Sequence, residues 1–164
     1  MSELDPRYER QVLVAELGEE GQRVLLRSSV LIVGCGALGS NLASLCVRAG
    51  IGTVRIVDRD RIERSNLARQ TLYDEDDVAA SRYKSQAAAA KLRRINADVT
   101  VEDHVLDVQA DNIEGLLDGI DVVLDGADNF EVRYLINDAC LKHGIPWVYA
   151  GVVATTGMSM TVRP

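Results

Sequence analysis

The sequence predicts a doubly wound α/β fold, in which a mainly parallel sheet has helices on both faces and follows an N-terminal helical arm. Short apolar runs of strand length alternate with segments of helical spacing through most of the 164 residues. Such alternation is typical of parallel strands joined by helical crossovers. A glycine-rich turn, "GCGALG" (34–39), follows the first apolar run and opens the next helical segment. The length suffices for one domain with a sizeable core.

The N-terminal arm is predicted from residues 8–28, "YERQVLVAELGEEGQRVLLRS". Their apolar residues have helical spacing, and Gly18 interrupts the pattern, so we expect two short helices. We therefore assign 1–28 to the arm and 29–164 to the main domain.

The main domain begins with "SVLIVG" (29–34), a continuously apolar run that predicts a strand buried on both faces. Later segments change period between that of a strand and that of a helix, and glycines end two of the helical segments. We expect a helix at 40–50, a strand at 52–58, a long helix at 77–96, a strand at 99–106, a short helix from 113, a strand at 121–128, a helix at 131–144 and strands at 146–154 and from 157. The last stretch, "GMSMTVRP", stops within a strand pattern, so we expect a chain truncated at its C-terminus.

Charge and composition narrow the functional classes. The net charge of −7 argues against a general nucleic-acid or anionic-membrane surface, which needs a basic face. No apolar run approaches the length of a membrane span. The three cysteines form no C-x-x-C pair and the N-terminus has no apolar signal segment. We therefore expect the protein to reside in the reducing cytoplasm. Two histidines are too few for a histidine-based metal site.

The glycine turn has the G-x-G-x-x-G spacing of a Rossmann-like phosphate loop. Gly34 permits the tight turn, Gly36 lets the backbone approach a phosphate, and Gly39 allows close helix–strand packing. Asp58 ends the next strand, where an acidic residue binds ribose hydroxyls. The alternative is a glycine turn needed only for packing. Cys35 within the loop is either a nucleophile or, as is commoner, a small buried filler.

A second cluster, "RIERSNLARQTLY" (61–73), gathers cationic and amide side chains in an otherwise acidic chain. Guanidinium groups match phosphate oxygens, and one pyrophosphate needs few donors beyond the helix N-terminus. Lys84 follows on the next helix, so the cluster indicates a triphosphate. For any one of these basic residues, a solvated surface charge is an equally good interpretation. An NAD-binding loop also remains an alternative.

These motifs together resemble the ThiF/MoeB/HesA family of adenylyltransferases, which are similar to the adenylation core of ubiquitin-activating enzymes. The resemblance covers nearly the whole chain and rests on "RYERQ", "GCGALG", "DRDRIERSNLARQ", Lys84 and "DGADNFEVR" in this order and spacing. It implies that the main domain is an adenylation domain that uses ATP and Mg²⁺. The acceptor would be the C-terminal carboxylate of a small ubiquitin-fold sulfur carrier ending in Gly-Gly, of the molybdopterin or thiamine type. Pyrophosphate would be released.

The resemblance also implies roles for individual residues. The catalytic residues would be Arg10, Arg69, Lys84 and Asp128, with Asp128 holding Mg²⁺. The ATP-binding residues would be Gly34, Gly36, Ala37, Leu38, Gly39, Asp58, Asp60, Asn66, Arg69, Gln70, Lys84, Asp128 and Asn129. Arg133 is a weaker candidate, and Arg61 and Arg64 are the cluster members least expected to contact ligand.

Family resemblance further implies a homodimer in which Arg10 enters the site of the other subunit. One departure lies at Ser81, where family members usually carry a glycine three residues before the lysine. The paired cysteines that hold zinc in many members would lie beyond the end of this chain, so zinc is possible only through residues there. Two alternatives stay open. One is a relative that adenylates another acceptor, such as a peptide or a tRNA-linked carboxylate. The other is a non-catalytic dimerising or NAD-binding module.

Overall fold

The computed structural model describes residues 4–164 and contains a six-stranded sheet in the order β3-β2-β1-β4-β5-β6. The first five strands are parallel and β6 pairs antiparallel with β5. The strands are β1 (Ser29–Val33), β2 (Thr53–Val57), β3 (Thr100–His104), β4 (Val122–Asp125), β5 (Trp147–Val153) and β6 (Thr156–Val162). The predicted α/β fold with its mainly parallel sheet is confirmed.

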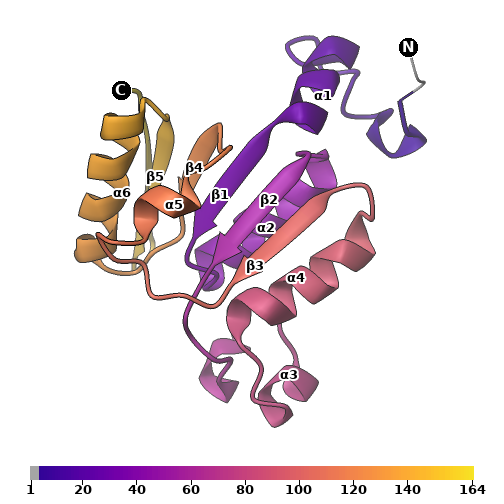
Figure 1. The fold of residues 1–164 in the computed structure, drawn as a ribbon. Coiled ribbons are helices and arrows are strands. Elements are labelled where there is room, and N and C mark those ends of the chain that lie inside the picture. Colours follow the sequence, from indigo (N-terminus) through magenta and orange to yellow (C-terminus); the bar gives the residue numbers. More distant parts are fainter. Residues whose placement is uncertain (1–3) are drawn as a thin grey trace.

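Helices cover both faces of this sheet (Figure 1). Helices α2 (Ala37–Ala49) and α4 (Lys84–Ile95) pack on one face, and α5 (Ile113–Leu116) and α6 (Phe130–His143) pack on the other. Alternate residues of β1 point to opposite faces, so Ile32 joins the core under α2 and α4 while Leu31 joins the core under α5 and α6. β1 is therefore buried on both sides, as its continuous apolar run predicts.

The arm differs from the prediction because its first half is not an α-helix. Residues Pro6–Tyr8 form a short 3₁₀ helix (η1), hydrogen-bonded turns follow, and the single α-helix of the arm is α1 (Gly18–Arg27). Two side chains hold this half of the arm in place: buried Tyr8 packs against Gly50, and Gln11 donates a hydrogen bond to the Ala49 carbonyl. These tertiary contacts hold the segment as a series of hydrogen-bonded turns instead of the predicted helix.

The prediction of one long helix over 77–96 is also wrong, because two helices, α3 (Glu75–Ala79) and α4, occupy this region. Ser81 adopts a left-handed conformation with φ of 50° between them. One contact from outside the segment stabilises the break, since the Ile62 N–H donates to the Arg82 carbonyl at 3.0 Å. A local ion pair between the Arg82 side chain and buried Asp77 adds to it. Glycine adopts such a φ more easily than serine, so the backbone here suits the glycine that the family resemblance implies at this position.

Other boundaries differ by a few residues. α2 begins at Ala37, earlier than the predicted 40–50, because the glycine turn leads directly into the helix. The 3₁₀ turn η2 (Arg64–Asn66) lies within the basic cluster.

Among the described residues, no helix has both the length and the apolar character of a membrane span.

The glycine turn generates the first testable prediction. A Cβ atom at Gly39 would overlap the Gly34 carbonyl oxygen, whereas a Cβ at Gly115 in α5 would meet no atom within 4 Å. We expect Gly39→Ala to lower the free energy of unfolding by at least ~2 kcal/mol, and Tm by roughly 4–8 °C. The matched variant Gly115→Ala should leave Tm unchanged or raise it slightly. Equal thermal stability of the two variants in calorimetry would show that the turn tolerates a side chain.

Candidate functional site

Two adjoining hollows lie at the carboxyl edge of the sheet, where the strand order changes direction at β1. Ligands of open α/β sheets bind at such a point. The β3-side hollow, about 800 Å³, extends from β1 towards the segment after β3, and the β6-side hollow, about 1100 Å³, extends towards β5 and β6. Five residues line both: Gly34, Asp58, Asp60, Ala127 and Asp128.

The glycine turn forms the floor between the hollows. Gly34 has a φ of 87°, and its N–H donates to the Val57 carbonyl at 2.8 Å, which fixes the turn to the end of β2. α2 begins immediately afterwards, so the N–H groups of its first turn have no partners within the helix. Gly36, Ala37 and Leu38 line the β6-side hollow, whereas Gly39 lies behind them against Gly34. The arrangement is that of an anion site at a helix N-terminus.

Asp58 connects this turn to the segment after β2. Its Oδ2 atom accepts a hydrogen bond from the Cys35 N–H and its Oδ1 atom accepts one from the Asp60 N–H, both at 2.7 Å. Burial raises the pKa of the Asp58 carboxyl, and these two hydrogen bonds oppose the rise. Each oxygen keeps a further lone pair, so the carboxylate can also accept hydroxyl groups of a ligand.

Cys35 is a buried filler in this structure rather than a nucleophile. Its side chain is fully buried, and burial raises the pKa of the thiol to about 12. A thiol with so high a pKa is not ionised at neutral pH and is a poor nucleophile. The Tyr73 hydroxyl donates to the Cys35 carbonyl at 2.7 Å, which secures the turn from the other side.

The basic cluster divides into residues that face the β6-side hollow and one that does not. Arg61, Asn66, Arg69 and Gln70 line the hollow. Arg64 points away and pairs with Glu75 at 2.9 Å on the exposed surface. Arg61 lies over the Tyr83 ring with its guanidinium carbon 4.0 Å from the ring centroid.

The amide side chains of the cluster have different surroundings. Asn66 caps the local turn, since its Oδ1 atom accepts the Glu63 N–H at 3.0 Å. Gln70 is only 3% exposed, and its Oε1 atom is buried with no hydrogen-bond partner among the described residues. The oxygen of this amide can only accept a hydrogen bond, so the Nε2 group is the part of Gln70 that can donate to an anion in the hollow.

Lys84 begins α4 and reaches the same hollow. Its side chain is 9% exposed and its Nζ atom pairs with Asp60 Oδ2 at 2.8 Å. An ammonium group with so little exposure loses most of its hydration and needs a polar or anionic partner. Asp60 is that anion here, and it lines both hollows.

The segment after β4 forms the opposite wall. Buried Asp125 accepts hydrogen bonds from the Ala127 N–H at 2.8 Å and from Arg133 Nε at 3.0 Å, so Asp125 orients this segment and does more than end a strand. Asn129 caps α6 by accepting the Val132 N–H at 3.0 Å. Asp128 lies between them and is exposed, and its carboxylate forms no ion pair within residues 4–164.

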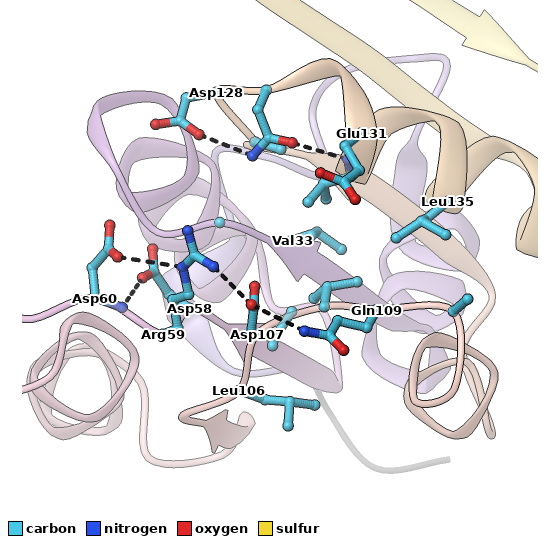
Figure 2. A pocket seen from close by; sticks show the side chains of 17 residues that line it. Val33, Asp58, Arg59, Asp60, Leu106, Asp107, Gln109, Asp128, Glu131 and Leu135 are labelled. Carbon is cyan, nitrogen blue, oxygen red and sulfur yellow. Dashed lines mark hydrogen bonds and ion pairs between the residues drawn. The ribbon is translucent and has the colours of Figure 1, made fainter.

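The β3-side hollow contains residues that the sequence motifs do not identify (Figure 2). Apolar side chains line much of it: Val33, Val57, Leu106, Val108, Val132 and Leu135. Arg59 and Asp107 both line it and form an ion pair at 2.7 Å. The only signal in the sequence is position, because "LDVQA" (106–110) follows β3 at the carboxyl edge of the sheet.

The β6-side hollow has an apolar wall opposite its donors. The wall is formed by Phe130, Tyr149, Val152, Val153 and Met158. The side chains of Phe130, Val152, Val153 and Met158 are more than half exposed. The hollow therefore combines a polar side suited to an anion with an apolar side suited to an extended chain.

Arg10 lies in neither hollow. It is exposed in the turns of the arm, which are held at the other end of the sheet through Tyr8 and Gln11 (Figure 1). Within its own chain it therefore does not join the other predicted site residues. The part of the chain that the structure describes also holds no group of three or more side chains suited to a metal ion.

Comparisons with known proteins agree with this geometry. The model of the ThiF family matches residues 8–164. A sulfur carrier protein ThiS adenylyltransferase of Bacillus subtilis is 48% identical over 96% of this chain and 47% of its own length. A sulfur carrier protein adenylyltransferase of Thermus thermophilus is 41% identical over 94% of this chain and 56% of its own length.

Solved structures resemble the same region. A crystal structure of Escherichia coli MccB with MccA-N7isoASN superposes with a TM-score of 0.85 at 28% identity, covering 98% of this chain and 48% of that one. MccB with ATP gives a TM-score of 0.79 at 29% identity, covering 93% and 46%. The chain thus spans about half the length of each of these relatives.

Proposed function

The chain belongs to the ThiF family, and from this we propose that it is the ATP-binding part of an adenylyltransferase that activates the C-terminal carboxylate of a small sulfur-carrier protein. The observation that carries the proposal is the donor-rich side of the β6-side hollow. There the first turn of α2, Gln70, Arg69 and Lys84 converge. The 48% identity to a sulfur carrier protein adenylyltransferase supports the choice of acceptor.

In this proposal the nucleoside of ATP lies in the β3-side hollow. Asp58 would accept the ribose hydroxyls, because its carboxylate lies at the boundary of the two hollows and keeps free lone pairs. The base would pack among the apolar side chains that line this hollow, such as Leu106 and Val108. A nucleotide would then extend across Asp58 towards the glycine turn.

The phosphates would lie in the β6-side hollow. The N–H groups of the first turn of α2 would hold one phosphate, as at other helix N-termini. The side-chain N–H groups of Asn66, Arg69, Gln70 and Lys84, all of which line this hollow, supply donors for the others. This number of donors exceeds what one pyrophosphate of NAD requires, which favours a nucleoside triphosphate.

Mg²⁺ would be held by Asp128 together with phosphate oxygens, because a hard cation prefers oxygen ligands and often binds through one or two carboxylates plus substrate. The exposed carboxylate, free of any ion pair within residues 4–164, fits this role. When bound, the ion would neutralise phosphate charge. Asn129 would orient Asp128, since its Nδ2 atom lies 3.3 Å from Asp128 Oδ1.

The reaction needs no protein nucleophile. An acceptor carboxylate oxygen attacks the α-phosphorus, a bond forms between them, the bond from the α-phosphorus to the β-phosphate oxygen breaks, and pyrophosphate leaves. The protein positions both partners and neutralises the leaving charge. Arg69 and Lys84 would contribute on the order of 2–4 kcal/mol each. The apolar wall with Tyr149 and Met158 would support the C-terminal segment of the acceptor.

A different acceptor is the second candidate. The likeness to MccB, solved with MccA-N7isoASN, favours it at 28% identity. The 48% identity to a ThiS adenylyltransferase favours the sulfur carrier. The donor count of the β6-side hollow disfavours a non-catalytic NAD-binding module.

Asp128 gives the direct test of the proposed reaction. In the whole protein, Asp128→Ala should reduce ATP–pyrophosphate exchange, measured with a carrier protein ending in Gly-Gly, by at least about 100-fold. The fold should persist, because the side chain is exposed and outside the core. Asp111→Ala, a matched exposed aspartate that lines neither hollow, should exchange normally. Normal exchange in the Asp128→Ala protein would remove Asp128 from the site.

We also propose a homodimer in which Arg10 serves the site of the other subunit, since the arm keeps Arg10 away from the hollows of its own chain. A two-fold dimer makes such an exchange reciprocal. Inactive Arg10→Ala and Asp128→Ala proteins should therefore complement each other. In a mixed dimer one site has both residues intact and the other lacks both.

Random mixing makes about half of the dimers mixed, so exchange activity should return to roughly a quarter of the wild-type value. Subunit exchange is verified with tagged chains. If Arg10 acts within its own chain, every site keeps one defect, and no activity returns although mixed dimers form.

A further inference from the structure

We propose that Asp60 is a competing anion for Lys84: it pairs with the lysine in the empty site, yields it to the nucleotide phosphates, and takes it back as pyrophosphate leaves. The inference rests on the proposed function, since it concerns the same phosphate-binding hollow. It gives Asp60 a role in product release rather than in holding ATP, the role that the family resemblance implies.

Backbone contacts fix the two residues side by side. The Lys84 N–H donates to the Asp60 carbonyl at 2.9 Å, and an antiparallel bridge joins the next pair, Arg61 and Tyr83. The Asp60 N–H in turn donates to Asp58 at 2.7 Å. Lys84 thus stays in place through its backbone, whether or not its side chain is paired with Asp60.

The side chains differ in their access to water. Lys84 is 9% exposed and Asp60 is 53% exposed, with 2.8 Å between Nζ and Oδ2. The nearly buried ammonium needs an anionic partner, whereas the carboxylate is hydrated without one. Lys84 can therefore change partners, from Asp60 to a phosphate oxygen, and leave Asp60 hydrated beside Arg59, whose Nε atom lies 3.8 Å from Asp60 Oδ1.

The position of Asp60 makes this change a competition. Asp60 lines both hollows, beside the proposed phosphate-binding residues. A bound pyrophosphate would lie near this carboxylate, and like charges repel. Both effects weaken pyrophosphate binding, which favours departure of the product. A role that only positions Lys84 predicts the opposite, because loss of the carboxylate would then weaken binding.

Asp60→Asn separates the two roles. Asparagine retains an oxygen that accepts a hydrogen bond from Lys84 but has no charge. We expect this variant of the chain to bind inorganic pyrophosphate 3–10-fold more tightly than wild type, by calorimetric titration without divalent metal. Glu75→Gln is the matched control. It removes one charge and the partner of Arg64 outside the hollow, and should leave the affinity unchanged.

A Lys84→Gln background tests whether the lysine carries the effect. In that background the fold increase in pyrophosphate affinity caused by Asp60→Asn should be at least halved, because there is no Lys84–Asp60 ion pair to break. Unchanged or weaker pyrophosphate binding by Asp60→Asn overturns the proposal, and so does an equal gain in both backgrounds. A folded wild-type chain that binds neither pyrophosphate nor ATP overturns the proposed function itself.

Discussion

Contact between the backbones of two loops determines the geometry of this site. The turn after β1 and the segment after β4 touch at Gly34 and Gly126, where a Cβ on either residue would lie 2.6 Å from a carbonyl oxygen of the other. Gly39 closes the contact from within α2. The phosphate loop and the segment that carries Asp128 can therefore lie beside each other at the edge of the sheet. Side chains at these positions would separate the two walls of the site.

Electrostatic pairing then holds the polar side chains in position before any ligand arrives. Lys84 pairs with Asp60, Arg133 with Asp125, and Arg61 stacks on Tyr83. These partners explain how an acidic chain can keep a local cluster of cations in place. A preorganised site avoids part of the cost of ordering its groups when substrate binds. Arg133 donates hydrogen bonds to Asp125 and to two carbonyl groups, so it stabilises the segment after β4.

The sequence predicts the sheet well because the buried strands have a clear periodicity. It also predicts the glycine turn and Asp58, whose positions follow from local spacing at strand ends. It fails at the break between α3 and α4. The residues there favour a helix, but the ladder that joins Ile62 to Arg82 comes from a segment twenty residues away. Single-sequence periodicity does not contain such contacts.

The limits are similar within the site. The sequence shows that Arg61 and Arg64 lie in one loop. It does not show which way each side chain points: tertiary contacts direct Arg64 towards Glu75 and Arg61 towards the hollow. The β3-side hollow has no motif, because apolar residues at strand ends resemble ordinary core. The predicted role of Arg10 depends on a second subunit, which the geometry of one chain does not supply. Residue roles taken from the family resemblance stay predictions.

The central claim is that the two hollows together form a site for a nucleoside triphosphate. Competitive calorimetric titration of the chain with ATP and NAD, both in Mg²⁺, tests it most directly. The account predicts that ATP binds and that NAD, even in large excess, does not displace it. Tighter binding of NAD than of ATP would contradict the claim and would identify the glycine turn as a dinucleotide site.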